Sequence, residues 1–154
     1  MTMLSLSTLV DDVYSYFFGR ELRVGEAKVA EKTVEVPIEI TPNGDEVAVS
    51  FTLEYDNNKL ANPKIRLGEI APDGSVLSVN TNEPGRVGIL IDSTETMTAS
   101  AIPQRLLVVT FEVIGEGVSA VSLTGSLAAM GISDAGGNSL SARYSNGKVD
   151  VHPK

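Results

Sequence analysis

Apolar and polar residues alternate along most of the chain after residue 20. The clearest case is Glu46–Asp56, EVAVSFTLEYD, in which an apolar residue occupies every second position. Successive side chains of a β-strand point to opposite faces, so these residues would line one face, whereas a helix would distribute them around its axis. We therefore predict a central strand with one buried face, made by Val47, Val49, Phe51, Leu53 and Tyr55.

Short runs of the same kind follow one another, separated by Gly, Pro, Asn and Asp turns such as Pro42–Glu46. About nine short strands with this spacing predict an all-β fold, a nine-stranded β-sandwich. Pro37 cannot donate a ladder hydrogen bond, which favours an edge strand or a bulge there. The runs that would supply these nine or so strands are Glu21–Ala30, which Gly25 could interrupt, Thr33–Thr41, Val47–Tyr55, Lys64–Leu67, Val76–Asn80, Arg86–Asp92, Gln104–Ile114, Ala120–Thr124, Leu127–Ile132 and Gly147–His152.

The first twenty residues have a different pattern. From Ser7 onward, apolar residues recur at three- and four-residue spacing, and Gly19 suits a helix end. We predict a short N-terminal helix within residues 1–20, with a linker or an expression remnant as the alternative, followed by one β-sandwich domain over residues 21–154.

Composition and charge exclude several classes of partner and chemistry. The formal net charge of −8 would repel a polyanion, so a nucleic-acid partner is excluded. No cysteine is present, which removes disulfides and thiolate chemistry, and no apolar run approaches the length of a membrane span, so no membrane insertion is expected. No signal peptide is recognisable, so the chain is either cytosolic or a fragment of a longer secreted protein.

Candidate catalytic groups are few. His152 is the sole histidine, and it lies three residues from one end of the sequence, where we expect it to be solvated. The acidic clusters fall mainly at turns, where Asp and Asn serve the backbone. A calcium site in the loops at Asp56 or Asp134 remains open, although neither matches the EF-hand pattern. We predict no enzyme activity, no catalytic residues and no metal ligands.

A β-sandwich without candidate catalytic residues is expected to act by binding a partner through its surface. If the strands 47–55, 86–92 and 104–114 are neighbours, their outward residues form a flat, weakly apolar face suited to a partner protein. The alternative is that residues 1–20, or a loop, cover this face. The predicted partner-binding residues are Ala48, Ser50, Thr52, Leu77, Gly88, Leu90, Leu106, Val108 and Thr110.

Several segments resemble a bacterial cohesin domain, the module that receives dockerins in cellulosome scaffoldins. The resemblance covers about 130 residues and is clearest in SFTLEYDNNKLANPKIRLGE (50–69), which is similar to the family pattern F-x-L-x-Y-D-x-x-x-L. The other matching segments are VEVPIEI (34–40), GRVGILIDST (85–94), RLLVVTFEV (105–113) and GKVDV (147–151).

The resemblance implies a nine-stranded jelly roll that is secreted or displayed at the cell surface and docks a dockerin-like module without catalysis. It places the dockerin on the third, fifth, sixth and eighth strands, which would be 47–55, 76–80, 87–92 and 104–113 here. It implies no cofactor, with any calcium supplied by the dockerin. Ala48 and Ser50 stand where dockerin-binding cohesins commonly carry amide or acidic side chains, so the chain looks closer to non-cellulosomal cohesins.

Two other functions are compatible with the fold. A carbohydrate-binding module shares the jelly-roll architecture, but it usually requires flat aromatic rings, and the aromatic content is 5% without tryptophan. A structural adhesin or spacer domain needs no ligand. A hydrolase ranks last.

Overall fold

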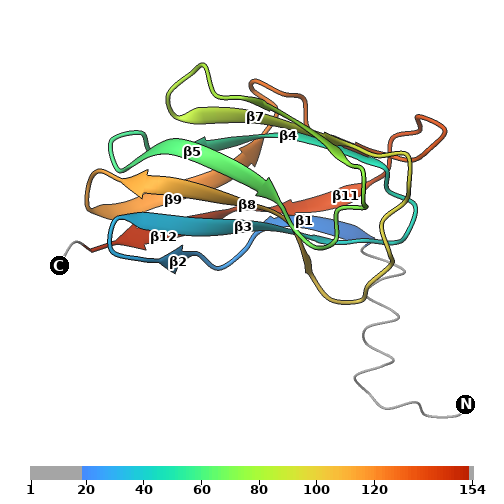
Figure 1. Cartoon of the computed structure of the whole chain (residues 1–154), viewed down its shortest axis with the longest axis horizontal. Coiled ribbons are helices and arrows are strands. Elements are labelled where there is room, and N and C mark those ends of the chain that lie inside the picture. The colour runs from blue at the N-terminus through green and yellow to red at the C-terminus, as the bar shows by residue number, and fades with distance from the viewer. Residues whose placement is uncertain (1–18, 153–154) are drawn as a thin grey trace, which may run out of the picture.

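A strand with one apolar face is stable only when that face packs against another. The computed structural model, which describes residues 19–152, meets this need with two β-sheets, and Figure 1 shows their strands running along the long axis of the molecule. The prediction of an all-β sandwich is confirmed.

The first sheet, sheet A, has the strand order β11-β1-β3-β8-β5, with β2 paired to β3. All neighbours are antiparallel except β1 and β11, which are parallel. Its strands are β1 (Arg20–Val24), β2 (Lys28–Val29), β3 (Thr33–Thr41), β5 (Leu60–Leu67), β8 (Gln104–Val113) and β11 (Ala142–Ser145).

The second sheet, sheet B, has the order β12-β9-β4-β7-β6, with β10 paired to β4. All of its pairings are antiparallel. Its strands are β4 (Ala48–Tyr55), β6 (Val76–Asn80), β7 (Arg86–Asp92), β9 (Gly117–Thr124), β10 (Gly131–Ser133) and β12 (Gly147–Val151).

The core lies between the sheets, and the predicted inward faces supply it. Val49, Phe51 and Leu53 of β4 are fully buried, and the ring of Tyr55 packs on Phe111 of β8 at 4.7 Å between centroids. The alternating inward sets of β7, β8 and β12 are buried or pack on the core as well. Two-residue periodicity therefore predicted which side chains fill the core.

The predicted strand count is wrong. Residues 19–152 form twelve strands rather than nine, because the predicted strand 21–30 divides into β1 and β2, and β11 has too few residues to display alternation. The chain does break at Gly25, between β1 and β2. The predicted N-terminal helix lies almost wholly outside the described residues. Residues 19–152 contain no helix long and apolar enough to cross a membrane.

The Pro37 prediction is half right. Strand β3 is interior, between β1 and β8, but the β3–β8 register shifts one residue beyond Pro37, between Ile38 and Glu39. Pro37 also falls in the gap between the β1 and β2 pairings, where its carbonyl accepts the backbone N–H of Gly25 at 2.8 Å. An interior sheet position tolerates this proline because no ladder bond is needed from it there.

Candidate functional site

The predicted three-strand face does not form as expected. Strands β4 and β7 are neighbours in sheet B, but β8 lies in sheet A between β3 and β5. Alternation shows which side of a strand faces inward but not which of two sheets the strand joins. The strand beside β4 on the side away from β7 is β9.

Three predicted site residues therefore belong to the opposite sheet. Leu106 is the extra residue at the β3–β8 register shift and is fully buried, because a bulge breaks strict alternation. Val108 lies between Pro37 and Arg66 in the sheet register and is 3% exposed. Thr110 accepts a hydrogen bond from Arg66 at 3.4 Å.

Leu77 is also misplaced. It is paired with the buried Ile91 and packs against the core, so its side chain lies on the inner side of β6. The outward residues of β6 are Val76, Ser78 and Asn80, which alternate with it.

The remaining predicted residues do share one surface, the outer face of β9, β4, β7 and β6, which we call the docking face. Ala48 is paired with Asp92, Ser50 with Leu90 and Thr52 with Gly88 across β4 and β7. Leu90 is 42% exposed at the middle of this face. The docking face thus contains Ala48, Ser50, Thr52, Gly88 and Leu90.

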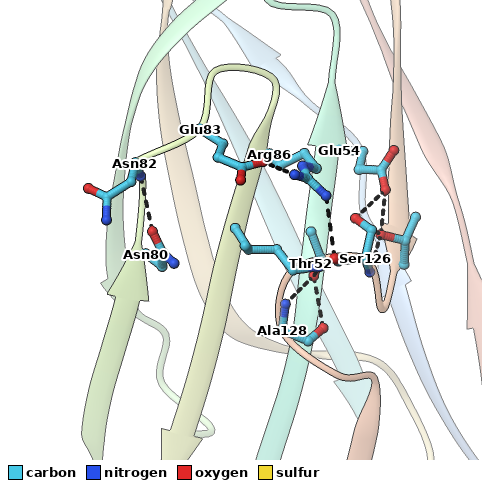
Figure 2. A network of polar contacts seen from close by, with 10 residues as sticks. Thr52, Glu54, Asn80, Asn82, Glu83, Arg86, Ser126 and Ala128 are labelled. Carbon is cyan, nitrogen blue, oxygen red and sulfur yellow. Dashed lines mark hydrogen bonds and ion pairs between the residues drawn. The ribbon is translucent and has the colours of Figure 1, made fainter.

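A loop of the chain itself covers part of the docking face. Strand β9 pairs with β4 up to Thr124, β10 resumes the pairing at Gly131, and residues 125–130 between them fold over the sheet. The Thr52 hydroxyl donates to the carbonyl of Ala128 at 2.8 Å and accepts the N–H groups of Leu127 and Ala128 at 3.0 and 2.7 Å. Thr52 is consequently fully buried, and Figure 2 shows the loop against it.

Gly88 leaves room for this close approach. A Cβ atom at Gly88 would lie 3.3 Å from the Cβ of Ala128 and 3.5 Å from the side chain of Leu127. Thr52 and Gly88 therefore lie directly beneath the loop. At these two positions the face is covered by a loop, as the alternative interpretation of the sequence expected.

A polar network fixes the near end of the loop. Glu54 accepts hydrogen bonds from the hydroxyls of Ser126 and Thr124, both at 2.7 Å, and Arg86 donates to the carbonyl of Ser126 at 3.3 Å (Figure 2). The Ser126 and Thr124 hydroxyls hold the pKa of Glu54 below its usual value, with a smaller contribution from Arg86. Arg86 is also paired with Glu83.

Leu90 separates two shallow hollows on the docking face. One has a volume of about 210 Å³ and lies between β6 and the loop. The other has a volume of about 230 Å³ and lies between β4 and β10. Besides Leu90, the first is lined by Ser78, Asn80, Gly88, Leu127 and Ala128, and the second by Ala48, Ser50, Ala129, Met130 and Ser133.

Sequence reasoning missed the contribution of the loop. Residues 127–132 were predicted as a strand, whereas residues 125–128 form bends and β10 begins at Gly131. Leu127 and Met130 thereby join the docking face, and Met130 is 39% exposed. The glycines that flank the loop, Gly125 and Gly131, were the available signal.

The candidate calcium loops are closed by hydrogen bonds of their own. Asp134 accepts the backbone N–H groups of Asn138 and Gly136 at 2.9 and 3.0 Å, and Asp56 binds Lys59 at 2.6 Å and the N–H of Asn58 at 2.9 Å. These bonds hold the pKa of each aspartate below its usual value. Among the described residues, no three His, Cys, Asp or Glu side chains gather as metal ligands. The prediction of no metal ligands stays a prediction, and a calcium site in these loops stays its alternative.

The histidine lies where the sequence suggested. His152 is exposed at the end of the described chain, 2.9 Å from the Asp150 carboxylate.

Comparison with known proteins gives the family. The model of the cohesin domain matches residues 22–151, which is most of the chain. The chain belongs to the cohesin family. No curated protein matches its sequence.

Solved cohesin structures share the fold. The sixth cohesin of scaffoldin B from Acetivibrio cellulolyticus, solved with a dockerin, is 19% identical and superposes with a TM-score of 0.72 over 86% of this chain and 99% of its own. A non-cellulosomal cohesin from Archaeoglobus fulgidus is 20% identical, with a TM-score of 0.67 over 84% of this chain and 88% of its own.

A cohesin module of a family 33 glycoside hydrolase from Clostridium perfringens is 15% identical, with a TM-score of 0.67 over 88% of this chain and 96% of its own. At these identities the likeness is one of fold.

Proposed function

We propose that this cohesin domain is a non-catalytic docking module and that its partner is a dockerin-like module bound on the docking face. The observation that carries the proposal is Leu90, an exposed leucine between two hollows on a sheet face of a cohesin fold. An exposed apolar patch of this kind with a polar rim suits a protein partner. In this proposal the domain is part of a secreted or cell-surface protein, and any calcium belongs to the dockerin.

The aromatic residues favour docking over carbohydrate binding. In residues 19–152, Phe51 and Phe111 are buried, while Tyr55 and Tyr144 are half-buried against the core. Burial also raises the pKa of Tyr144. No aromatic ring in this part of the chain is exposed as a platform for a sugar.

The test is calorimetric titration of the domain with a panel of calcium-loaded dockerin modules. We expect binding by at least one of them and a loss of about thirtyfold or more in affinity for Leu90→Asp, because a buried charge at the centre of an interface costs more than 2 kcal/mol.

The matched control is Ile114→Asp. Ile114 is a leucine-sized exposed residue that directly follows β8 of sheet A, and its replacement should leave the affinity unchanged. Equal losses in the two variants, or no binding by any dockerin, would overturn the proposal.

A further inference from the structure

Strand β6 ends sheet B with an open edge. It pairs with β7 on one side, and no strand of the described chain pairs with its other side. Every second residue of such a strand presents an unpaired N–H and C=O, and an added strand would satisfy both. Figure 2 shows Asn80 at one end of this strand.

The strands at the other three ends of the two sheets carry features that hinder pairing, and β2 and β10, which also pair on one side only, have just two and three residues. Strand β5 has Pro63, a register shift between Ala61 and Lys64, and Asn62 with a positive φ of 52°. Strand β12 carries Lys148 and Asp150, and β11 has four residues with an arginine among them. Bulges, prolines, charges and short length are the usual means of keeping an edge unpaired.

Strand β6 has none of these features. Its sequence, VLSVN, lacks proline, glycine and charge, and the neutral stretch extends from Ser75 to Asn82. Val76 is 62% exposed and Val79 is 41% exposed. An exposed neutral edge with apolar residues is suited to pairing with another strand.

We propose that β6 pairs with β6 of a second copy, antiparallel and centred on Ser78, so that sheet B continues through a two-fold axis. Two residues that lie opposite each other in neighbouring strands must point to the same face of the sheet. Side chains alternate between the faces along β6, so an even-numbered residue can pair only with an even-numbered one, and an odd-numbered residue only with an odd-numbered one. Centring on Ser78 lets all five residues pair, with Leu77 opposite Val79 on the inner side and Ser78 opposite its own copy.

The contact itself is uncharged, although the two whole molecules repel each other. The net charge of −8 on each copy opposes association, but the five residues of β6 carry no charge, and the flanking Asp73 and Glu83 lie in the turns beyond its two ends. The remaining repulsion acts over longer distances, where salt screens it. Dimerisation should therefore strengthen between about 0.02 M and 0.5 M sodium chloride.

This pairing goes beyond docking and uses the backbone edge of β6 rather than the outer face of the sheet. An antiparallel continuation of a sheet keeps its outer face on one side, so the dimer would present two docking faces side by side. Leu90 lies on β7, one strand in from the contact, and a dimer that fails to form leaves the docking proposal intact.

Sedimentation equilibrium of the full chain up to about 1 mM tests the dimer, with charge substitutions at the two-fold. Ser78 is exposed, so Ser78→Lys and Ser78→Glu should fold, and each should weaken the homodimer tenfold or more by placing like charges directly opposite. Mixing the two variants should restore a heterodimer. Val29→Lys, an equally exposed edge position in sheet A, should leave dimerisation unchanged.

Disulfide trapping locates the contact. The natural chain has no cysteine, so Ser78→Cys should give a cross-linked dimer under mild oxidation, and Val29→Cys should not do so at the same rate. A monomer at 1 mM, a dimer indifferent to charge at position 78, or equal cross-linking at both positions would overturn the proposal. If β6 instead pairs with a strand of another protein, the domain alone would remain a monomer at 1 mM.

Discussion

At the scale of single residues, the buried pair of Arg20 and Glu46 ties three parts of the chain together. Glu46 is fully buried in the turn before β4, and Arg20 of β1, which is 4% exposed, donates to it at 2.7 Å. Arg20 also donates to Asp45 at 2.9 Å and to the carbonyl of Ser141, just before β11, at 2.5 Å. The pair thus connects the turn, β1 and the strand that lies parallel to β1.

The ionisation of Glu46 is stabilised despite its burial. Burial raises the pKa, but the N–H of Asn43, the Arg20 side chain and the N–H of Gly44 together bring it below the usual 4.5. The unfolded chain then binds the proton more tightly than the folded chain does. Stability from this group is present above pH 4.5 and is lost as the pH falls through the lowered folded value.

We predict that Glu46→Gln lowers the free energy of unfolding by about 2 to 4 kcal/mol at pH 7, because Arg20 stays buried with less of its charge compensated. Urea unfolding between pH 3 and pH 7 measures this. The difference between the two proteins should shrink as the pH falls below 4.5, because the unfolded wild-type chain then gains a proton that the folded glutamate, with its lowered pKa, resists. A difference that is constant with pH would contradict the ionised pair.

The sequence indicated Asp45 and Glu46 as an acidic pair in a turn, which is correct for their position. It could not indicate Arg20, because the two sequence positions are brought together by the pairing of β1 with β3 and not by any local pattern.

At the scale of elements, the loop 125–130 decides how much of the docking face is free. It interrupts the strand that accompanies β4 and is held by one buried hydroxyl, that of Thr52. The exposed part of the face is therefore built from Ala48, Ser50 and Leu90 together with residues of the loop.

Replacing Thr52 with the isosteric valine tests this arrangement. Thr52→Val leaves the N–H groups of Leu127 and Ala128 without their acceptor, and we predict a loss of about 1 to 3 kcal/mol in the free energy of unfolding. Hydrogen exchange at these two amides should accelerate. Thr110→Val, on sheet A, should change neither quantity, and unchanged exchange in Thr52→Val would show that the hydroxyl does not hold the loop.

The strand pattern explains both the successes and the errors at this scale. The buried faces of β4, β7, β8 and β12 were readable because each strand is long enough to show alternation. The sheet that β8 joins, and the bulge that buries Leu106, depend on contacts with β3 and β5. Such contacts leave no local signature in the sequence.

At the scale of the whole molecule, the two outer faces differ in character. On sheet A, Arg66 binds Glu35 at 3.0 Å across β8, so charged side chains span the middle of that sheet. On sheet B, the middle is occupied by Leu90, Ser50 and the loop. Three of the four strands to which the family resemblance assigned the dockerin lie together in sheet B, whereas the fourth, 104–113, lies in sheet A.

The most direct test of the docking claim is hydrogen exchange of the whole domain with and without an excess of calcium-loaded dockerin. We expect slower exchange in residues 48–50, 88–90 and 127–130 of the complex, with β5 and β8 of sheet A unaffected. Protection confined to β5 and β8, or no change in any segment, would contradict it.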